Sequence, residues 1–251
     1  RPAELLSTAP FADLQIDEPA ERTVGAFESA RLALVGAARG RQFTSATAEV
    51  RKGGEPTPEK RDEEDPGEPW ARGRGGTRLG RAVHAAIQSL PLDADDSLIA
   101  AFSRAQAVAE AIPQRESDVR RLVPQALSSE AAGRARAAAR ALREVPFAIQ
   151  SGDVTLEGYA DMVIETAEGL EIVDWKTDQI SPDQIERRLE DYRLQAGLYA
   201  WGLGRATGRH VHRVTYVFVS AGREVSPGEP GALAEMAERH LATRTAAPSS
   251  Q

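Results

Sequence analysis

Cysteine is absent from the 251-residue sequence, which excludes disulfides, zinc–thiolate sites and iron–sulfur clusters. Aromatic residues are also sparse, at 5%. We find no signal peptide and no apolar stretch of roughly 18 residues, so we expect a soluble, cytoplasmic protein without membrane contact. Phosphate-binding loops of the GxxxxGK[ST] and GxGxxG types are missing as well, which predicts that this chain is not itself a nucleotide-driven motor.

An excess of positive charge is lacking too, because the formal net charge is −7 at pH 7. This argues against a surface that coats nucleic acid generally, so a nucleic-acid site must be local, or assisted by a metal or by partner domains. The hydrophobic content of 41% and the length predict one domain, or one domain with an extension. The chain begins at Arg1, and we expect it to be a piece of a longer polypeptide.

Composition divides the chain into four parts. We interpret residues 1–51 as an N-terminal arm or linker with short helices, and residues 77–245 as the folded domain. Residues 52–76 are dominated by proline, glycine and charged residues, which leaves too little apolar surface to offset chain entropy and predicts a disordered insertion. Its acidic run could bind a partner, although a solvated linker is the simpler explanation. Residues 246–251 are expected to form a flexible tail.

The most informative part of the sequence is a pair of strand-like runs between residues 154 and 177. In the first, apolar residues from Val154 to Ile164 alternate with polar ones, which is typical of a half-buried strand. A turn at 167–169 ends in a glycine that can adopt positive φ. The second run extends from Leu170 to Thr177. A hairpin this short can bring Asp161 of the first run close to Asp174 of the second.

Paired carboxylates indicate one type of chemistry. Asp161 and Asp174 would repel each other at one spot, and a hard divalent cation such as Mg²⁺ is the usual way of holding them together. Lys176 shares a strand face with Asp174, where it can orient the attacking water or neutralise charge that grows on a phosphate. The alternative is an edge hairpin with ordinary charges on its solvated face.

The remaining elements supply two further candidate ligands. Thr77 is a suitable N-cap for a helix that carries His84, a residue that could be a ligand or a packing residue. Residues 97–142 are predicted to continue helically with breaks at Pro113 and Pro124. Glu144 follows at a helix-to-strand junction, as a ligand or simply a surface residue.

The C-terminal third predicts a helix, a strand and a helix. Ser181 to Gln184 forms a capping-box start for a helix that runs to about residue 204 and places Gln195 and Tyr199 one turn apart. Residues 210–220 are predicted to form a strand interior to the sheet, and 229–243 an amphipathic helix. The fold class is therefore α/β, a mixed central sheet flanked by helices.

Taken together, residues 77–220 resemble the PD-(D/E)XK nuclease superfamily, and within it the RecB/AddA-type nuclease domain at the C-terminus of bacterial UvrD-like helicase–nucleases. The resemblance rests on five short sequences that occur in the expected order: GRAVHAAIQ, EVPF, GYADMVIE, VDWKT and QAGLY. A predicted closing strand follows them. It implies a restriction-endonuclease-like core with helical additions.

The resemblance also implies a metal site. His84, Asp161 and Asp174 would ligate a catalytic Mg²⁺ or Mn²⁺, the backbone carbonyl of Trp175 would complete the site, and Glu144 would be an auxiliary ligand. Carboxylates with one imidazole suit these ions better than zinc.

Further roles follow from the same resemblance. Asp161, Asp174 and Lys176 would be the catalytic residues. Gln195 and Tyr199 would support the lysine and contact DNA, with help from Tyr192. Gly158 would leave room beside the metal.

The implied activity is that of an exonuclease that hydrolyses phosphodiester bonds, mainly of single-stranded DNA ends, in double-strand break repair or recombination. Its partners would be DNA, helicase motor domains of the same parent polypeptide and a partner subunit. Three alternatives stay open: a free-standing exonuclease, an inactive copy kept for DNA binding or scaffolding, and an unrelated α/β fold without a metal.

Overall fold

The structure is a computed structural model that describes residues 42–46, 48–49 and 77–245. The predictions made for most of the N-terminal arm, for the insertion and for the tail concern residues outside this described part.

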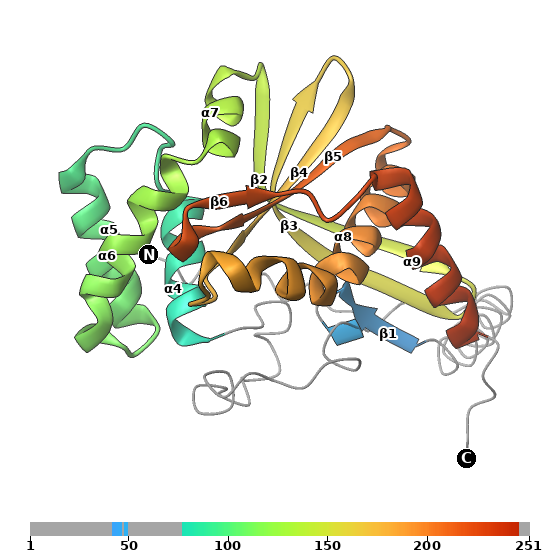
Figure 1. The fold of residues 1–251 in the computed structure, drawn as a ribbon, viewed down its shortest axis with the longest axis horizontal. Helices are drawn as coiled ribbons and strands as arrows, with labels where there is room; N and C mark the ends of the chain where they lie inside the picture. The colour runs from blue at the N-terminus through green and yellow to red at the C-terminus, as the bar shows by residue number, and fades with distance from the viewer. Residues whose placement is uncertain (1–41, 47, 50–76, 246–251) are drawn as a thin grey trace, which may run out of the picture. The chain divides into compact units, whose positions relative to one another are not determined.

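Six strands form one mixed sheet (Figure 1). They are β1 (Gln42–Ser45), β2 (Arg140–Ser151), β3 (Val154–Thr166), β4 (Gly169–Lys176), β5 (Val211–Phe218) and β6 (Arg223–Val225). β2, β3 and β4 are successive antiparallel neighbours, whereas β1 pairs parallel with β3 and β5 pairs parallel with β4. The predicted α/β fold with a mixed sheet is confirmed, and so is the hairpin, in which Gly169 has a φ of 136°.

The two edges of β3 have different neighbours. β2 pairs with β3 along its length, from Val154 to Glu165. The other edge is shared, because residues 154–157 pair with β1 whereas residues 162–166 pair with β4. The β3–β4 ladder therefore stops at Met162 and Val173, and the next residues of the two strands are Asp161 and Asp174.

Three strand assignments differ from the predictions. β1 lies in the stretch assigned to the arm, and β6 follows the strand expected to close the sheet. β2 begins at Arg140, so the prediction of helix up to residue 142 was wrong. The alanine- and arginine-rich sequence favours helix locally, but pairing with β3 from Arg140 onward overrides this preference.

Four helices cover one face of the sheet: α4 (Arg78–Ser89), α5 (Asp96–Ala109), α6 (Glu116–Leu127) and α7 (Glu130–Ala137). Their apolar sides share a core with Met162, Val173 and Trp175 of the sheet. Pro113 separates α5 from α6, as predicted, but Pro124 lies inside α6 and does not break it. The neighbouring Val123 and Ala126 are fully buried, and this burial offsets the missing backbone donor.

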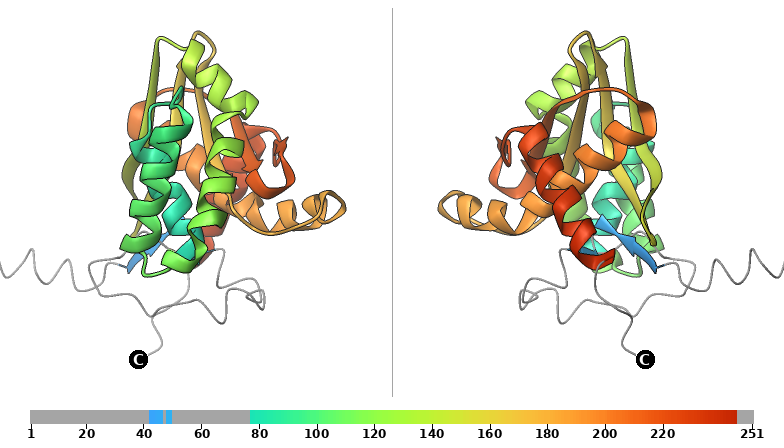
Figure 2. Two further views of the ribbon diagram at one scale, coloured as in Figure 1. Left: turned by 90° about the vertical axis from the view of Figure 1, so that its left-hand side faces the viewer. Right: turned by 90° about the vertical axis from the view of Figure 1, so that its right-hand side faces the viewer.

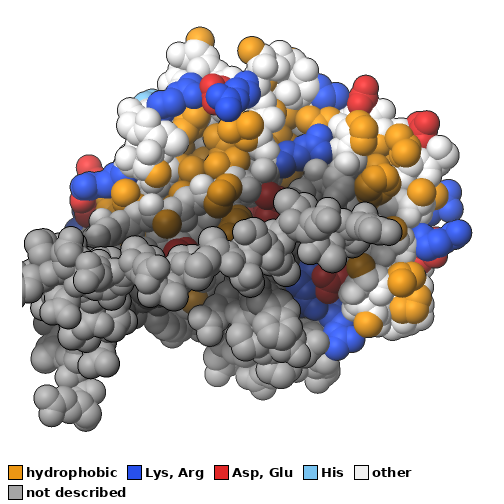
Figure 3. Space-filling model, turned by 180° about the vertical axis from the view of Figure 1, so that it is seen from behind, with side chains coloured by type: hydrophobic (Ala, Val, Ile, Leu, Met, Phe, Trp, Pro, Cys, Tyr) orange, Lys and Arg blue, Asp and Glu red, His pale blue; other side chains and the backbone are white. Residues whose placement is uncertain are grey.

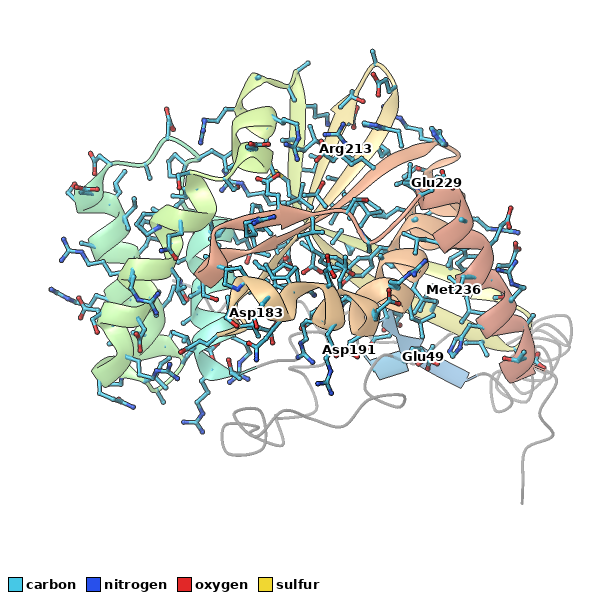
Figure 4. The ribbon with its side chains drawn as sticks, in the orientation of Figure 1. Glu49, Asp183, Asp191, Arg213, Glu229 and Met236 are labelled. Atoms are coloured by element: carbon cyan, nitrogen blue, oxygen red, sulfur yellow. The ribbon has the colours of Figure 1, made fainter. Side chains whose placement is uncertain are left out.

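The opposite face is covered by α8 (Ile185–Thr207) and α9 (Pro230–Thr245). The right-hand view of Figure 2 brings α9 to the front, where it packs along α8. The predicted capping box of Ser181 and Gln184 is present, at a 3-10 turn (Pro182–Gln184) that leads into α8. α8 ends at Thr207 and is capped by Gly208, which has a φ of 65°. Near the far end of α9, Nε2 of His240 lies 2.8 Å from Oε2 of Glu49, the residue labelled beside β1 in Figure 4.

The β2–β3 ribbon exchanges its faces at one point. In a regular strand Leu156, Ala160, Met162 and Ile164 would all lie on one face. Instead, Leu156 and Ala160 pack in the core beneath α8 and α9, whereas Met162 and Ile164 pack in the core beneath α4–α7. The exchange falls at Asp161, where the pairing with β2 is interrupted. The alternation in the sequence is therefore not one continuous face, and the interruption is where the site is found.

Candidate active site

Asp161 occupies the point at which β3 and β4 separate. Its Oδ2 accepts a hydrogen bond from the backbone N–H of Trp175 at 2.8 Å. The side chain thus replaces the backbone acceptor that β3 no longer offers where the ladder ends. Its Oδ1 lies 3.2 Å from Nδ1 of His84. Burial raises the pKa of Asp161, but His84, Lys176 and the Trp175 N–H outweigh burial and hold that pKa below its usual value.

His84 is brought to Asp161 by α4. The N-cap is confirmed, because Oγ1 of Thr77 accepts the N–H of Gly80 at 3.0 Å. The apolar stripe of the helix, which includes Val83 and Ile87, is buried, and His84 lies beside it with 28% of its side chain exposed. Burial lowers the pKa of His84, but the Asp161 carboxylate outweighs burial and raises that pKa to about 9.

Glu144 reaches the same place from β2. The flanking pairs, Arg143 with Met162 and Val145 with Ala160, place Glu144 opposite Asp161. Glu144 has a φ of 48°, a left-handed conformation that costs a residue other than glycine on the order of 1 kcal/mol or more and is concentrated at functional sites. One ligand atom from each of His84, Glu144 and Asp161 lies within 4.8 Å of the others.

This donor set fits a hard divalent cation. Two carboxylates and one imidazole are typical ligands of Mn²⁺ and, with water, of Mg²⁺, and the three elements that carry them converge on one spot. A bound cation would also offset the two carboxylate charges, of which that of Asp161 has His84 and Lys176 as counter-charges.

Asp174 is turned toward Lys176. The side chain is 3% exposed, and Oδ1 lies 2.7 Å from Nζ of Lys176. Burial raises the pKa of Asp174 to about 6, and Asp161 adds to this while Lys176 opposes it. Asp174 is outside the three-residue ligand cluster, so a cation that used it would compete with Lys176.

Lys176 is held by α8. Nζ donates to Oε1 of Gln195 at 2.7 Å, and Nε2 of Gln195 donates to the hydroxyl of Tyr199 at 3.2 Å. The Tyr199 ring packs edge-on against Phe147, with centroids 5.9 Å apart. The sequence pieces EVPF, VDWKT and QAGLY therefore form one connected set of contacts around the lysine.

Tyr192 contributes its ring more than its hydroxyl. Nζ of Lys176 lies 4.2 Å from the centroid of that ring, a cation–π contact. The hydroxyl points to Asp178 and donates to its Oδ2 at 2.7 Å, and Arg188 pairs with the same carboxylate at 3.2 Å.

Sequence reasoning missed three of the residues around Lys176: Asp178, Arg188 and Tyr216. Nζ of Lys176 is 4.9 Å from the ring of Tyr216, whose hydroxyl donates to the backbone oxygen of Tyr192. Tyr216 lies in a strand whose sequence is largely apolar. Asp178 directly follows VDWKT, and this position was the one available signal.

Gly158 has a different role from the one implied. A Cβ at this position would overlap the ring of Phe147, which is the cross-strand partner of Gly158. The same ring faces Gly202 of α8. Gly158 therefore makes room for Phe147 under α8, not for the metal.

In the described ranges no helix is long and apolar enough to cross a membrane.

Comparisons with known proteins show the family of this chain. The family model described as the PD-(D/E)XK nuclease superfamily matches residues 61–249. Among curated proteins, an ATP-dependent helicase/nuclease subunit of Carboxydothermus hydrogenoformans is 33% identical over 75 residues, which are 30% of this chain and 6% of that protein. The protein of the same name from Acetivibrio thermocellus is 31% identical over 93 residues, 30% of this chain and 7% of that protein. The chain thus spans a small part of the length of these relatives. Among solved structures, the crystal structure of SSO0001 has a TM-score of 0.32 and 17% identity over 67% of this chain and 83% of that one, a similarity too low to support an argument.

Proposed function

Because this chain belongs to the PD-(D/E)XK nuclease superfamily, we propose that it is a divalent-metal-dependent deoxyribonuclease that hydrolyses phosphodiester bonds at single-stranded DNA ends. The observation that carries the proposal is the convergence of His84, Glu144 and Asp161 within 4.8 Å, beside Lys176 in contact with Asp174. Mg²⁺ or Mn²⁺ is the proposed cation, held by the three converging residues and by Asp174 once Lys176 turns toward substrate.

Each residue has a distinct part in the proposed reaction. A divalent cation at this site would supply an activated water at neutral pH and offset charge on the phosphate. Lys176, positioned by Gln195 and by the ring of Tyr192, would donate to the phosphate oxygen on which charge develops. Its side chain is 11% exposed, and at low solvent exposure its charge acts more strongly than it would in water.

The wider setting is proposed from the relatives. Their shared description as ATP-dependent helicase/nuclease proteins favours a nuclease that works with helicase motor domains and a partner subunit in DNA break repair or recombination. The second candidate for the same site is a free-standing exonuclease. An inactive copy is disfavoured, because Asp161, Asp174 and Lys176 are all present.

The test is degradation of end-labelled single-stranded DNA by the full chain with Mg²⁺, Mn²⁺ or EDTA. We expect cutting with either metal, none with EDTA, and none with Asp174→Ala. Glu235→Gln, which changes an exposed carboxylate on α9, is the matched control and should cut normally. Cutting in EDTA, or undiminished cutting by Asp174→Ala, would overturn the proposal.

A further inference from the structure

Beyond the ligand cluster, one face of the β2–β3 ribbon is not covered by any element of the described part of the chain. Every second cross-strand pair after Glu144 and Asp161 belongs to this face, and the first two are Pro146 with Tyr159 and Ala148 with Glu157. The side chains of all four are exposed. Tyr159 is 47% exposed, and among the exposed large hydrophobic residues of the described ranges it is the one aromatic.

This uncovered face is continuous with the ligand cluster. Tyr159 precedes Asp161 by two residues and Pro146 follows Glu144 by two. Val145 and Ala160, which lie between the members of each pair, pack in the core beneath α8 and α9. Tyr159 and Pro146 therefore point to the other side of the ribbon, the side on which His84 of α4 contacts Asp161. In the view from behind the molecule (Figure 3), hydrophobic side chains gather in the middle of the described surface, with charged side chains among and around them.

We propose that Tyr159 is the stacking platform for the nucleobase next to the scissile phosphodiester, with Pro146 as the apolar neighbour that supports its ring. The inference rests on the proposed nuclease function and specifies how that site selects its substrate. A base offers a π-face to an exposed tyrosine whatever its identity, so the contact is tolerant of sequence.

The spacing suits one nucleotide. Two residues along a strand span about 6.6–6.8 Å, a step comparable with that between successive phosphates of an extended single strand. Glu157, the next exposed side chain on the face, is negatively charged and would repel a further phosphate. The platform therefore takes one base, after which the strand leaves the ribbon.

Stacking on Tyr159 also explains a preference for single strands. A base inside a duplex has both faces covered by its neighbours, and exposing one face costs unstacking free energy. A single-stranded end offers the face at little cost.

The test combines changes in the protein and in the DNA. The full chain as wild type, Tyr159→Ala and Tyr159→Trp is given single-stranded oligonucleotides that are intact or abasic next to the cleaved bond. We expect Tyr159→Ala to raise KM on intact DNA roughly tenfold, with little change in kcat, and Tyr159→Trp to restore KM. On abasic DNA the wild type and Tyr159→Ala should have equal KM. Leu98→Ala, at a 40% exposed position on α5, is the control and should leave KM unchanged.

Each result bears on a separate claim. Equal KM of wild type and Tyr159→Ala on intact DNA, or an equal loss on intact and abasic DNA, would overturn the stacking role while leaving the nuclease function in place. If the wild type does not cut DNA at all, the proposed function fails, and the same protein and DNA pairs are then compared by fluorescence anisotropy. Binding of intact DNA that weakens in Tyr159→Ala but not on abasic DNA would still support the platform, and equal binding would overturn it.

Discussion

Replacement of Gln195 by leucine should disable Lys176 while leaving the fold in place. Gln195 is 5% exposed, and its Oε1 accepts from Nζ of Lys176 at 2.7 Å. Leucine fills much of the same volume but accepts no hydrogen bond, so the ammonium would keep Asp174 as its remaining acceptor nearby and turn toward it. A hydrogen bond to a charged group contributes about 1.5–3 kcal/mol.

If that free energy is lost from the reacting arrangement, kcat should fall roughly 10- to 100-fold, since about 1.4 kcal/mol corresponds to a factor of ten. The assay is single-turnover cleavage at saturating DNA and metal, with thermal unfolding measured beside it. Tyr199→Phe is the matched control, because it removes the hydroxyl that accepts from Nε2 of Gln195. We expect kcat to fall less, by roughly two- to tenfold, since a neutral hydrogen bond contributes about 0.5–1.5 kcal/mol.

A double mutant distinguishes a direct role of Gln195 from one that acts through Lys176. If Gln195 acts through Lys176, then Gln195→Leu should cost little more once Lys176→Met is present, because residues that act as a unit are not additive. Additive losses in the double mutant, or a folded Gln195→Leu protein with wild-type kcat, would refute the role through Lys176.

Three further predictions concern stability. Gly158→Ala should cost about 1–3 kcal/mol through overlap with the buried ring of Phe147, seen as a Tm lower by roughly 3–10 °C. Gly133→Ala on α7 is the control, because a Cβ there would make only an ordinary contact with the Arg136 side chain, and it should not lower Tm. Equal Tm changes would contradict the packing argument. In the metal-free protein the pKa of His84 is raised from 6.5 to about 9, so the stability that His84 contributes is fully present below pH 6.5 and is lost as the pH rises to 9. In urea unfolding with chelator, His84→Gln should lower the free energy of unfolding more at pH 6 than at pH 9.5. The reverse order would exclude the His84–Asp161 pair as the cause. Arg143→Met should destabilise the protein by about 1–2 kcal/mol. Methionine cannot replace the hydrogen bonds that Nη1 of Arg143 donates to the carbonyls of Ile87 and Gln88 at the end of α4. An unchanged urea midpoint would show that these hydrogen bonds make no net contribution to stability.

Local patterns in the sequence were sufficient for the hairpin and for the helix ends. Alternation and Gly169 predicted β3 and β4, and capping residues predicted the start of α4 and the 3-10 turn (Pro182–Gln184) that leads into α8. These features depend on neighbours in sequence, as does the placement of Asp174 and Lys176 on one strand face.

Features that depend on distant partners were missed. β1 is four residues long and is a strand because β3 offers it an edge beyond the end of β4. The exchange of faces at Asp161 and the left-handed backbone of Glu144 interrupt the alternation that the sequence displays. The pairing of Asp174 with Lys176, and the enclosure of the lysine by Tyr192 and Tyr216, depend on how α8 packs on the sheet. The metal and catalytic roles of the individual residues stay predictions.

We expect metal binding and the lysine to be separate parts of one nuclease site. Mn²⁺ titration followed by electron paramagnetic resonance, with DNA cleavage by the same samples, separates them in wild type, Asp161→Asn and Lys176→Gln. Asp161→Asn should lose both bound Mn²⁺ and cleavage, whereas Lys176→Gln should keep Mn²⁺ and lose cleavage. Cleavage by Asp161→Asn at the wild-type rate, or loss of Mn²⁺ from Lys176→Gln alone, would rule out this division of roles.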